Sequence, residues 1–140
     1  MARSWSLSLN RSKCVVMRFG SRPFYESGSD SGYKLNGISL SLARSHRDLG
    51  VLVDVSLRFH LHVNSVVQRA TSLINQLLRA TVCRAPDFMV TLFVSHIRPL
   101  IDYCSSVWNL GFIVDSRRLE SIQRRWTREV AGFSMMDYAT

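Results

Sequence analysis

The chain has 140 residues, of which 46% are hydrophobic and 20% charged, and its 18 basic residues outnumber its 10 acidic ones to give a net charge of +8. This balance excludes a disordered segment and allows one domain with a sizeable core. All the basic residues except Lys13 and Lys34 are arginines, whose planar guanidinium donates two hydrogen bonds to one phosphate. The composition therefore favours a polyanionic partner, nucleic acid before a membrane surface, with a solubilising surface as the alternative.

The cysteine pattern and the apolar runs restrict the compartment. Cys14, Cys83 and Cys104 are odd in number and far apart, which predicts free thiols in a reducing environment. The apolar run from Phe88 to Val94 is too short to span a membrane, and the first twenty residues lack the apolar core of a secretory signal. We therefore expect an intracellular protein, nuclear or cytoplasmic, that is neither secreted nor bound to a membrane.

The first third of the chain has the pattern of short strands. Cys14 to Phe19 is apolar and β-branched and ends at a glycine, which predicts a strand. Residues 21–32 are rich in Ser, Gly, Pro and Asp and predict a loop. The pair Asn36-Gly37 between two alternating runs is a strong hairpin signal. A further strand is predicted from Leu49 to Val53.

After the strands the hydrophobic period becomes helical. An amphipathic helix is predicted from about Phe59 to Cys83, and a central helix that is apolar all round from Phe88 to Ile97. Pro99 should kink that helix or begin another. The last helix is predicted from Asp115 to Ala131, ending before a glycine. The fold class is therefore α+β, a small N-terminal antiparallel sheet followed by a C-terminal helical bundle.

The last predicted helix carries five arginines away from its apolar stripe. At about 100° per residue, three of them stack opposite the stripe and two lie to one side. Such a face is suited to lie along a phosphate backbone, although a solvated outer face is the usual role of a charged helix surface. The three opposite the stripe are Arg117, Arg124 and Arg128, and the two to the side are Arg118 and Arg125.

Signals for catalysis are weak throughout the chain. The sequence has no nucleophile-elbow motif and no phosphate-binding glycine loop followed by lysine. His60 and His62 are two residues apart in a predicted helix and so point away from each other. Asp48 and Asp54 offer two carboxylates, but a turn cap is the simpler role for Asp54. We predict no catalytic, cofactor-binding or metal-binding residues, and a complete small enzyme is disfavoured.

Taken in order, six segments resemble the reverse transcriptase of non-LTR, LINE-type retrotransposons of the jockey and CR1 kind. They are LNRSKCVVMRFG, YKLNGISL, RDLGVLVD, the F-x-x-H pair Phe59 and His62, RPLIDYCSSVW and LESIQRRWTR. The likeness covers about residues 5 to 133. Two places depart from the family pattern: Ile101-Asp102 stands where the family tends to have Leu-Glu, and the sequence after Gly132 differs more.

The resemblance implies a domain organisation. Residues 1–55 resemble the end of the palm with its hairpin, residues 56–133 the thumb, and residues 134–140 a truncated tail of the frame. The family's catalytic aspartates, including the Tyr-x-Asp-Asp turn that holds Mg²⁺, belong to upstream strands and have no counterpart in this sequence. The chain is thus expected to be a fragment that is inactive alone, with no cofactor of its own.

The same resemblance implies where nucleic acid would bind. Lys13 matches the palm lysine near the phosphates of the incoming nucleotide, and Asn36 and Gly37 match the hairpin near the primer end. The expected partner is an RNA or DNA template–primer, bound by Lys13 and by the arginines of the last helix. The alternatives are a helical protein-interaction module, self-associating through exposed apolar surface, and a transposon relic without function.

Overall fold

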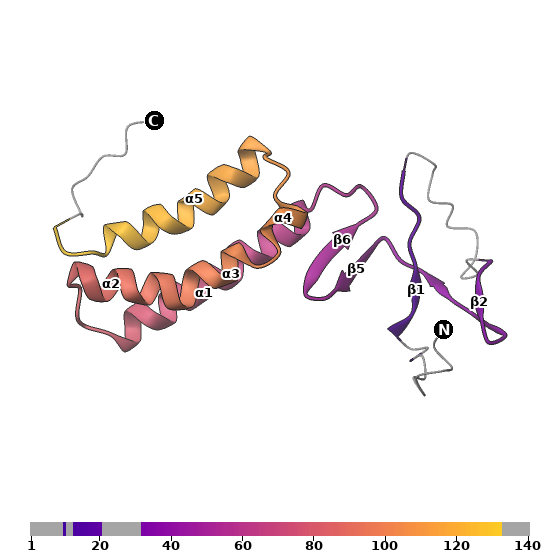
Figure 1. Cartoon of the computed structure of the whole chain (residues 1–140), viewed down its shortest axis with the longest axis horizontal. Helices are drawn as coiled ribbons and strands as arrows, with labels where there is room; N and C mark the ends of the chain where they lie inside the picture. Colours follow the sequence, from indigo (N-terminus) through magenta and orange to yellow (C-terminus); the bar gives the residue numbers. More distant parts are fainter. Residues whose placement is uncertain (1–9, 11–12, 21–31, 133–140) are drawn as a thin grey trace. The chain divides into compact units, whose positions relative to one another are not determined.

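The computed structural model describes residues 10, 13–20 and 32–132. The chain divides into two units, Met1–Leu57 and Arg58–Thr140. The described part of the first consists of strands and turns, and that of the second consists of helices (Figure 1). The predicted α+β class is therefore confirmed.

The strand unit contains three two-stranded sheets within the described residues. Two pairs, β2–β3 and β5–β6, are antiparallel, and the first of them is the predicted hairpin. The third pair, β1–β4, is parallel, with Val15 opposite Ser41. The alternating pattern of a strand fixes which face is apolar and not which strand becomes its neighbour, so this pairing had no local signal. The bounds are β1 Val15–Val16, β2 Lys34–Leu35, β3 Ile38–Ser39, β4 Ser41–Leu42, β5 Ser45–Asp48 and β6 Val51–Asp54.

The predicted hairpin at Asn36-Gly37 is confirmed. Leu35 pairs with Ile38, and the two residues between them have φ values of 51° and 81°. Two consecutive residues with positive φ form the turn whose twist matches that of the flanking strands, and Asn and Gly are the residues that accept it at least cost.

A second hairpin was not predicted, and it corrects the strand expected from Leu49 to Val53. Asp48 pairs with Val51, while Leu49 and Gly50 form the turn with φ values of 45° and 88°. Leucine rarely adopts positive φ, so the apolar run gave no signal that Leu49 lies in a turn. The observed strand β6 begins two residues later.

Asp54 ends the second hairpin in the role predicted for it. Its carboxylate accepts a hydrogen bond from the Ser56 backbone N–H at 2.7 Å and one from the Ser56 hydroxyl. A carboxylate bound in this way caps its own turn.

The first helix of the second unit, α1, confirms the amphipathic prediction. It runs from His60 to Ala80, a few residues shorter at its C-terminal end than expected. Phe59 precedes it with φ 57°, an unfavourable conformation for a bulky residue, and its side chain is buried. The apolar stripe faces the core, where its buried members are Val63, Val66, Ala70 and Ile74.

The helix predicted over residues 88–97 is present and contains a π-helical turn, but the prediction that it is buried is wrong. The segment divides into α2 (Pro86–Leu92), a π-helical turn η3 (Phe93–Ile97) and α3 (Arg98–Asp102). Pro99 has no N–H to donate to the carbonyl four residues earlier, and the widened turn before it lets the Arg98 N–H reach the Phe93 carbonyl.

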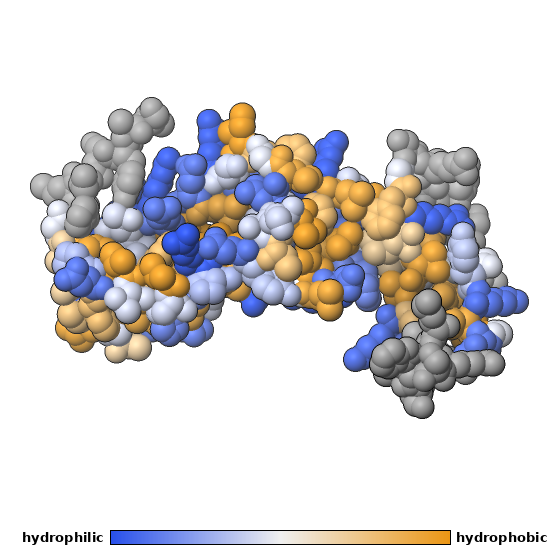
Figure 2. Space-filling view, in the orientation of Figure 1, coloured by the Kyte–Doolittle hydropathy of each residue, from blue (hydrophilic) through white to orange (hydrophobic). Residues whose placement is uncertain are grey.

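The segment is also buried on one side only. Met89 and Ile97 are fully buried, whereas Phe88, Val90 and Val94 are exposed. Figure 2 shows apolar side chains on the visible surface beside hydrophilic ones. A helix covered by neighbours on one side leaves its other apolar residues in solvent, and periodicity alone does not show how many neighbours there are.

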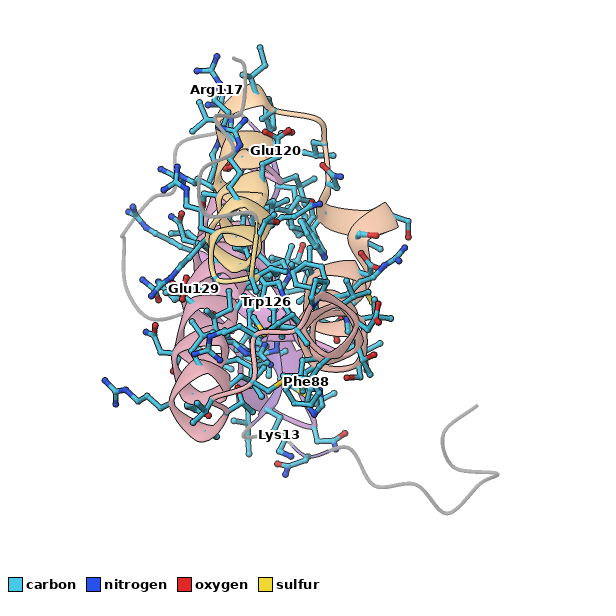
Figure 3. All side chains as sticks on the ribbon, turned by 90° about the vertical axis from the view of Figure 1, so that its left-hand side faces the viewer. Lys13, Phe88, Arg117, Glu120, Trp126 and Glu129 are labelled. Atoms are coloured by element: carbon cyan, nitrogen blue, oxygen red, sulfur yellow. The ribbon has the colours of Figure 1, made fainter. Side chains whose placement is uncertain are left out.

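The last two helices complete the core. The short helix α4 (Ser105–Trp108) buries Trp108, whose Nε1–H donates to the Tyr103 carbonyl at 2.8 Å. The helix α5 (Ile113–Arg128) buries Trp126, whose Nε1–H donates to the Met89 carbonyl at 3.1 Å. Trp126 lies between the helices in Figure 3. The core cluster consists of Ala70, Ile74, Met89, Ile97, Ile122, Trp126 and Val130.

Candidate nucleic-acid interface

The helices α1 and α5 lie side by side and run in the same direction (Figure 1). Three side-chain contacts join the helices: His60 meets Asp115, Asn64 meets Arg118, and Asn75 meets Arg125. Residue numbers increase in the same order on both helices, so the helices are parallel. The surface along this seam belongs to two segments about fifty residues apart in the sequence. Four of the contacting residues, His60, Asn64, Asn75 and Asp115, were not predicted to share it.

The arginines of α5 form two groups. Arg117, Arg124 and Arg128 are exposed on the side away from the core, and Arg117 points outwards in Figure 3. Arg118 and Arg125 instead reach across to α1. Helical periodicity predicted the two groups. It did not predict that Arg118 and Arg125 have partners on another helix.

The charges of these arginines are compensated to different degrees. Arg124 forms an ion pair with Glu120 at 3.3 Å. Arg118 donates to the Asn64 side-chain oxygen at 2.6 Å and lies 3.8 Å from Asp115 Oδ1. Arg125 donates to the Asn75 side-chain oxygen at 2.5 Å. An amide oxygen accepts a hydrogen bond without cancelling the positive charge, so the asparagine contacts hold the guanidinium groups in place. Asp115 offsets part of the Arg118 charge, whereas the Asn75 contact leaves the charge of Arg125 uncancelled.

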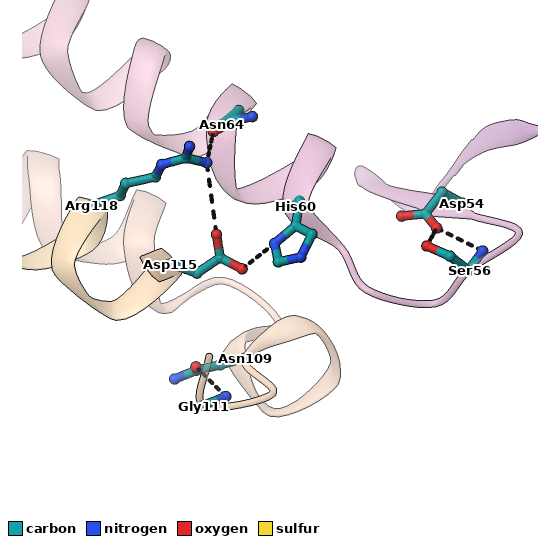
Figure 4. A network of polar contacts seen from close by, with 8 residues as sticks. All are labelled: Asp54, Ser56, His60, Asn64, Asn109, Gly111, Asp115 and Arg118. Carbon is teal, nitrogen blue, oxygen red and sulfur yellow. Dashed lines mark hydrogen bonds and ion pairs between the residues drawn. The ribbon is translucent and has the colours of Figure 1, made fainter. Parts of the chain in front are cut away.

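A buried carboxylate fixes the start of this seam (Figure 4). Asp115 lies in the first turn of α5, where the helix dipole favours a negative charge. Its Oδ2 lies 2.5 Å from His60 Nδ1, and the His60 ring also contacts Phe112. Arg118 approaches the other carboxylate oxygen. These contacts join the first turns of α1 and α5.

The F-x-x-H pair is part of the core. Phe59 and His62 are both buried, and the His62 ring meets the Trp108 ring edge-on at 5.4 Å between centroids. His60 and His62 thus have different surroundings, in line with the prediction that they point apart. In the described part of the chain, no three His, Cys, Asp or Glu side chains are grouped as a metal site would require.

Lys13 belongs to the strand unit and is exposed. Its backbone N–H donates to the Asn10 carbonyl at 3.2 Å. The arginines of α5 belong to the helical unit.

The cysteines are free thiols, as predicted. Cys104 has φ 52° and precedes α4. A hydrogen bond with the Cys104 side chain, and the negative charge of that side chain as a thiolate, raise the pKa of the neighbouring Tyr103 above its ordinary value. This pair lies within the segment RPLIDYCSSVW.

An apolar cavity of about 250 Å³ lies beside the core, where α2 and η3 face α5. Phe93 and Trp126 meet there with their ring centroids 6.2 Å apart. The remaining lining residues are Pro86, Val90, Gln123, Thr127 and Val130. The cavity is on a different side of α5 from the contacts with Asn64 and Asn75.

Two curated proteins are similar to this chain over nearly all of its length. Each is described as the RNA-directed DNA polymerase from mobile element jockey. The protein from Drosophila funebris is 26% identical over 135 residues, and that from Drosophila melanogaster is 23% identical over 137 residues, each match covering 94% of this chain. The resemblance to the reverse transcriptases of jockey-type non-LTR retrotransposons is confirmed.

The match covers only 14% of the length of each jockey polymerase, so the chain corresponds to a small part of such an enzyme. No family model and no solved structure matches it. Among the residues that the structure describes, no helix has the length and apolar character needed to cross a membrane.

Proposed function

We propose that this chain is a nucleic-acid-binding part of a jockey-type reverse transcriptase, in which the helical unit holds the template–primer. In this proposal residues 1–55 correspond to the end of the palm and residues 56–133 to the thumb. The chain contributes binding and not chemistry, because its sequence has no Tyr-x-Asp-Asp turn, and Mg²⁺ is bound by carboxylates elsewhere in the enzyme. The observation that carries the proposal is the exposed row of arginines on α5.

The physical basis is electrostatic. A protein that replaces counterions along a phosphate backbone gains affinity that falls steeply with salt. Arg117, Arg124 and Arg128 occupy three positions along one side of α5, and only Arg124 is paired with a carboxylate of that helix. The net charge of +8 also attracts the chain to a negatively charged nucleic acid.

The test is binding of an RNA–DNA hybrid, measured by fluorescence anisotropy between 50 and 200 mM salt, a range of about fourfold over which such contacts weaken strongly. The variant Arg117→Ala, Arg124→Ala, Arg128→Ala should bind more weakly and lower the slope of log affinity against log salt by about two to three. The matched control is Lys34→Ala, Arg47→Ala, Arg58→Ala, which removes the same charge from exposed positions outside α5.

The two triple variants decide the location of binding. Binding by α5 requires the control to keep a steeper slope than the α5 variant. Equal slopes in the two variants would mean that only net charge matters, and an unchanged slope in the α5 variant would remove its arginines from the interface.

In this proposal Lys13 acts only in the complete enzyme. The resemblance assigns it to the phosphates of an incoming nucleotide, which also needs the Mg²⁺ site. In this chain alone, Lys13→Ala removes one exposed charge, and we expect it to change hybrid binding less than the α5 triple variant does.

Self-association is a second candidate function, favoured by the exposed apolar residues Phe88, Val90 and Val94. Apolar surface grouped on one segment is a feature of interaction sites. Sedimentation velocity over a range of protein concentrations tests it, and Val90→Glu should abolish any concentration dependence. A chain that sediments as a monomer at all concentrations would exclude this candidate.

A further inference from the structure

Two side-chain hydrogen bonds of the same kind connect α1 to α5. Asn64 accepts from Arg118 and Asn75 accepts from Arg125. On α1 the two asparagines are eleven residues apart, which is three helical turns and about 16 Å. On α5 the two arginines are seven residues apart, which is two turns and about 10 Å. Both spacings return to the same side of a helix, so the pair of contacts repeats along the seam.

The acceptor in both contacts is a neutral amide oxygen. A guanidinium has five N–H donors, and each asparagine oxygen accepts from one nitrogen of it. The carboxylates of Glu120 and Asp102 instead form exposed ion pairs with Arg124 and Arg98. The asparagine contacts therefore restrict the guanidinium without cancelling its charge and leave other donors for an anion.

We propose that Asn64 and Asn75 are positioning residues that hold Arg118 and Arg125 ready to bind two phosphates of one nucleic-acid backbone along the α1–α5 seam. The inference rests on the proposed nucleic-acid binding and adds α1 to the interface. The guanidinium groups are about 10 to 16 Å apart by the helix spacings above, so they serve two phosphates and not one. Because the two arginine side chains are already ordered before binding, the complex loses less side-chain entropy when it forms.

The effect should be larger at Arg125 than at Arg118. Arg118 also lies 3.8 Å from the carboxylate of Asp115, which attracts the same guanidinium. Removal of the Asn64 amide therefore leaves Arg118 with a second partner. The single variant Asn75→Ala is expected to weaken hybrid binding more than Asn64→Ala does.

The first experiment keeps the net charge constant. The double variant Asn64→Ala, Asn75→Ala should bind an RNA–DNA hybrid about threefold to tenfold more weakly, the range expected when rotamer-rich side chains must be ordered on binding. Its salt slope should match that of the unaltered chain, because both arginines still reach their phosphates. The double variant Arg118→Ala, Arg125→Ala shows how much affinity is lost when both guanidinium groups are absent. It should also lower the slope of log affinity against log salt by about two.

The second experiment keeps the hydrogen bonds and cancels the charge. Asn64→Asp, Asn75→Asp preserves side-chain shape while it converts each contact into an ion pair. The matched control is Gln68→Glu, Gln76→Glu, which adds the same charge on exposed positions of α1. The aspartate variant should have the higher Tm of the two and yet bind the hybrid more weakly. A role of the asparagines in stability alone predicts the higher Tm without the weaker binding.

The outcomes separate this inference from the function on which it rests. Loss of binding in the double arginine variant, with unchanged binding in the double alanine variant, would overturn the positioning role and leave the proposed function intact. Unchanged binding in both arginine variants, the double and the α5 triple, would overturn the proposed function itself. Should circular dichroism show that the alanine variant is unfolded, the comparison of the aspartate and glutamate variants decides, and equal binding by those two would overturn the inference.

Discussion

The strand unit and the helical unit differ in what holds their residues in place. Among the described residues of the strand unit, Val51 is the one buried apolar side chain, and each sheet has two strands. The helical unit buries apolar side chains from α1, α2, η3, α4 and α5. Two-stranded hairpins are marginal in water without a packed face. The described strands therefore depend mainly on turn geometry and backbone hydrogen bonds, and the helices on packing.

The largest expected effect is on the packed side of this comparison. Trp126→Ala removes a buried indole that contacts Phe93 and bonds to the Met89 carbonyl. We expect the helical unit to lose about 3–5 kcal/mol of unfolding free energy, measured by urea unfolding followed by circular dichroism at 222 nm. Val82→Ala, at a side chain 94% exposed, is the control and should change little.

The same contrast predicts that Trp126→Ala leaves the strand unit folded. The amide resonances of the hairpin at Asn36-Gly37 should be unaltered in the Trp126 variant, because the two units have separate sources of stability. Loss of those resonances together with the helical signal would contradict the division into two independently stabilised units.

A smaller effect is expected at the seam between α1 and α5. His60→Ala removes the hydrogen-bond partner of the buried Asp115 carboxylate, and hydrogen bonds to charged groups contribute about 1.5–3 kcal/mol. Because His60 is half-exposed, we expect a loss of about 2 kcal/mol in the same urea experiment. His96→Ala removes a histidine from an exposed position and is the matched control. Equal losses in the two variants would mean that the His60 contact adds nothing to stability.

The parts of the fold that were predicted from the sequence are those with a local cause. The stripe of α1 and that of α5 repeat every three to four residues, and the Asn36-Gly37 turn needs only its own two residues. The start of α3 follows from Pro99, which lacks an N–H. In each case the residue that determines the structure lies within or next to it.

The parts that were missed depend on contacts between distant segments. The arginine row of α5 could be read from helical spacing, but the partners Asn64 and Asn75 lie about fifty residues away. Their spacing of three helical turns predicts that both lie on one side of α1. No feature of the nearby sequence indicated which helix that side would face. The exposure of Val90 and Val94 was missed for the same reason, since it depends on how many neighbours cover the segment.

The hairpin at Gly37 tests the other side of the comparison. Its φ is 81°, and a Cβ added there would meet no atom within 4 Å, so a substitution costs backbone strain and no steric overlap. Gly37→Ala should destabilise the hairpin by about 1 kcal/mol. Faster hydrogen exchange of the Leu40 N–H, which donates to the Tyr33 carbonyl, is the measurement. The urea midpoint of the helical unit should not move, and Ser39→Ala should leave the exchange rate nearly unchanged.

The smallest effect should be a gain in stability. Leu49 occupies the first turn position of the second hairpin with φ 45°, and 84% of it is exposed. A leucine in this conformation is strained and buries almost nothing here, whereas Asn accepts positive φ and would form an Asn-Gly turn with Gly50. Leu49→Asn should therefore stabilise β5–β6 by about 0.5–1 kcal/mol, seen as slower hydrogen exchange of their paired amides. Faster exchange would mean that the Leu49 side chain is covered in solution, and local turn geometry would then not be the main support of this hairpin.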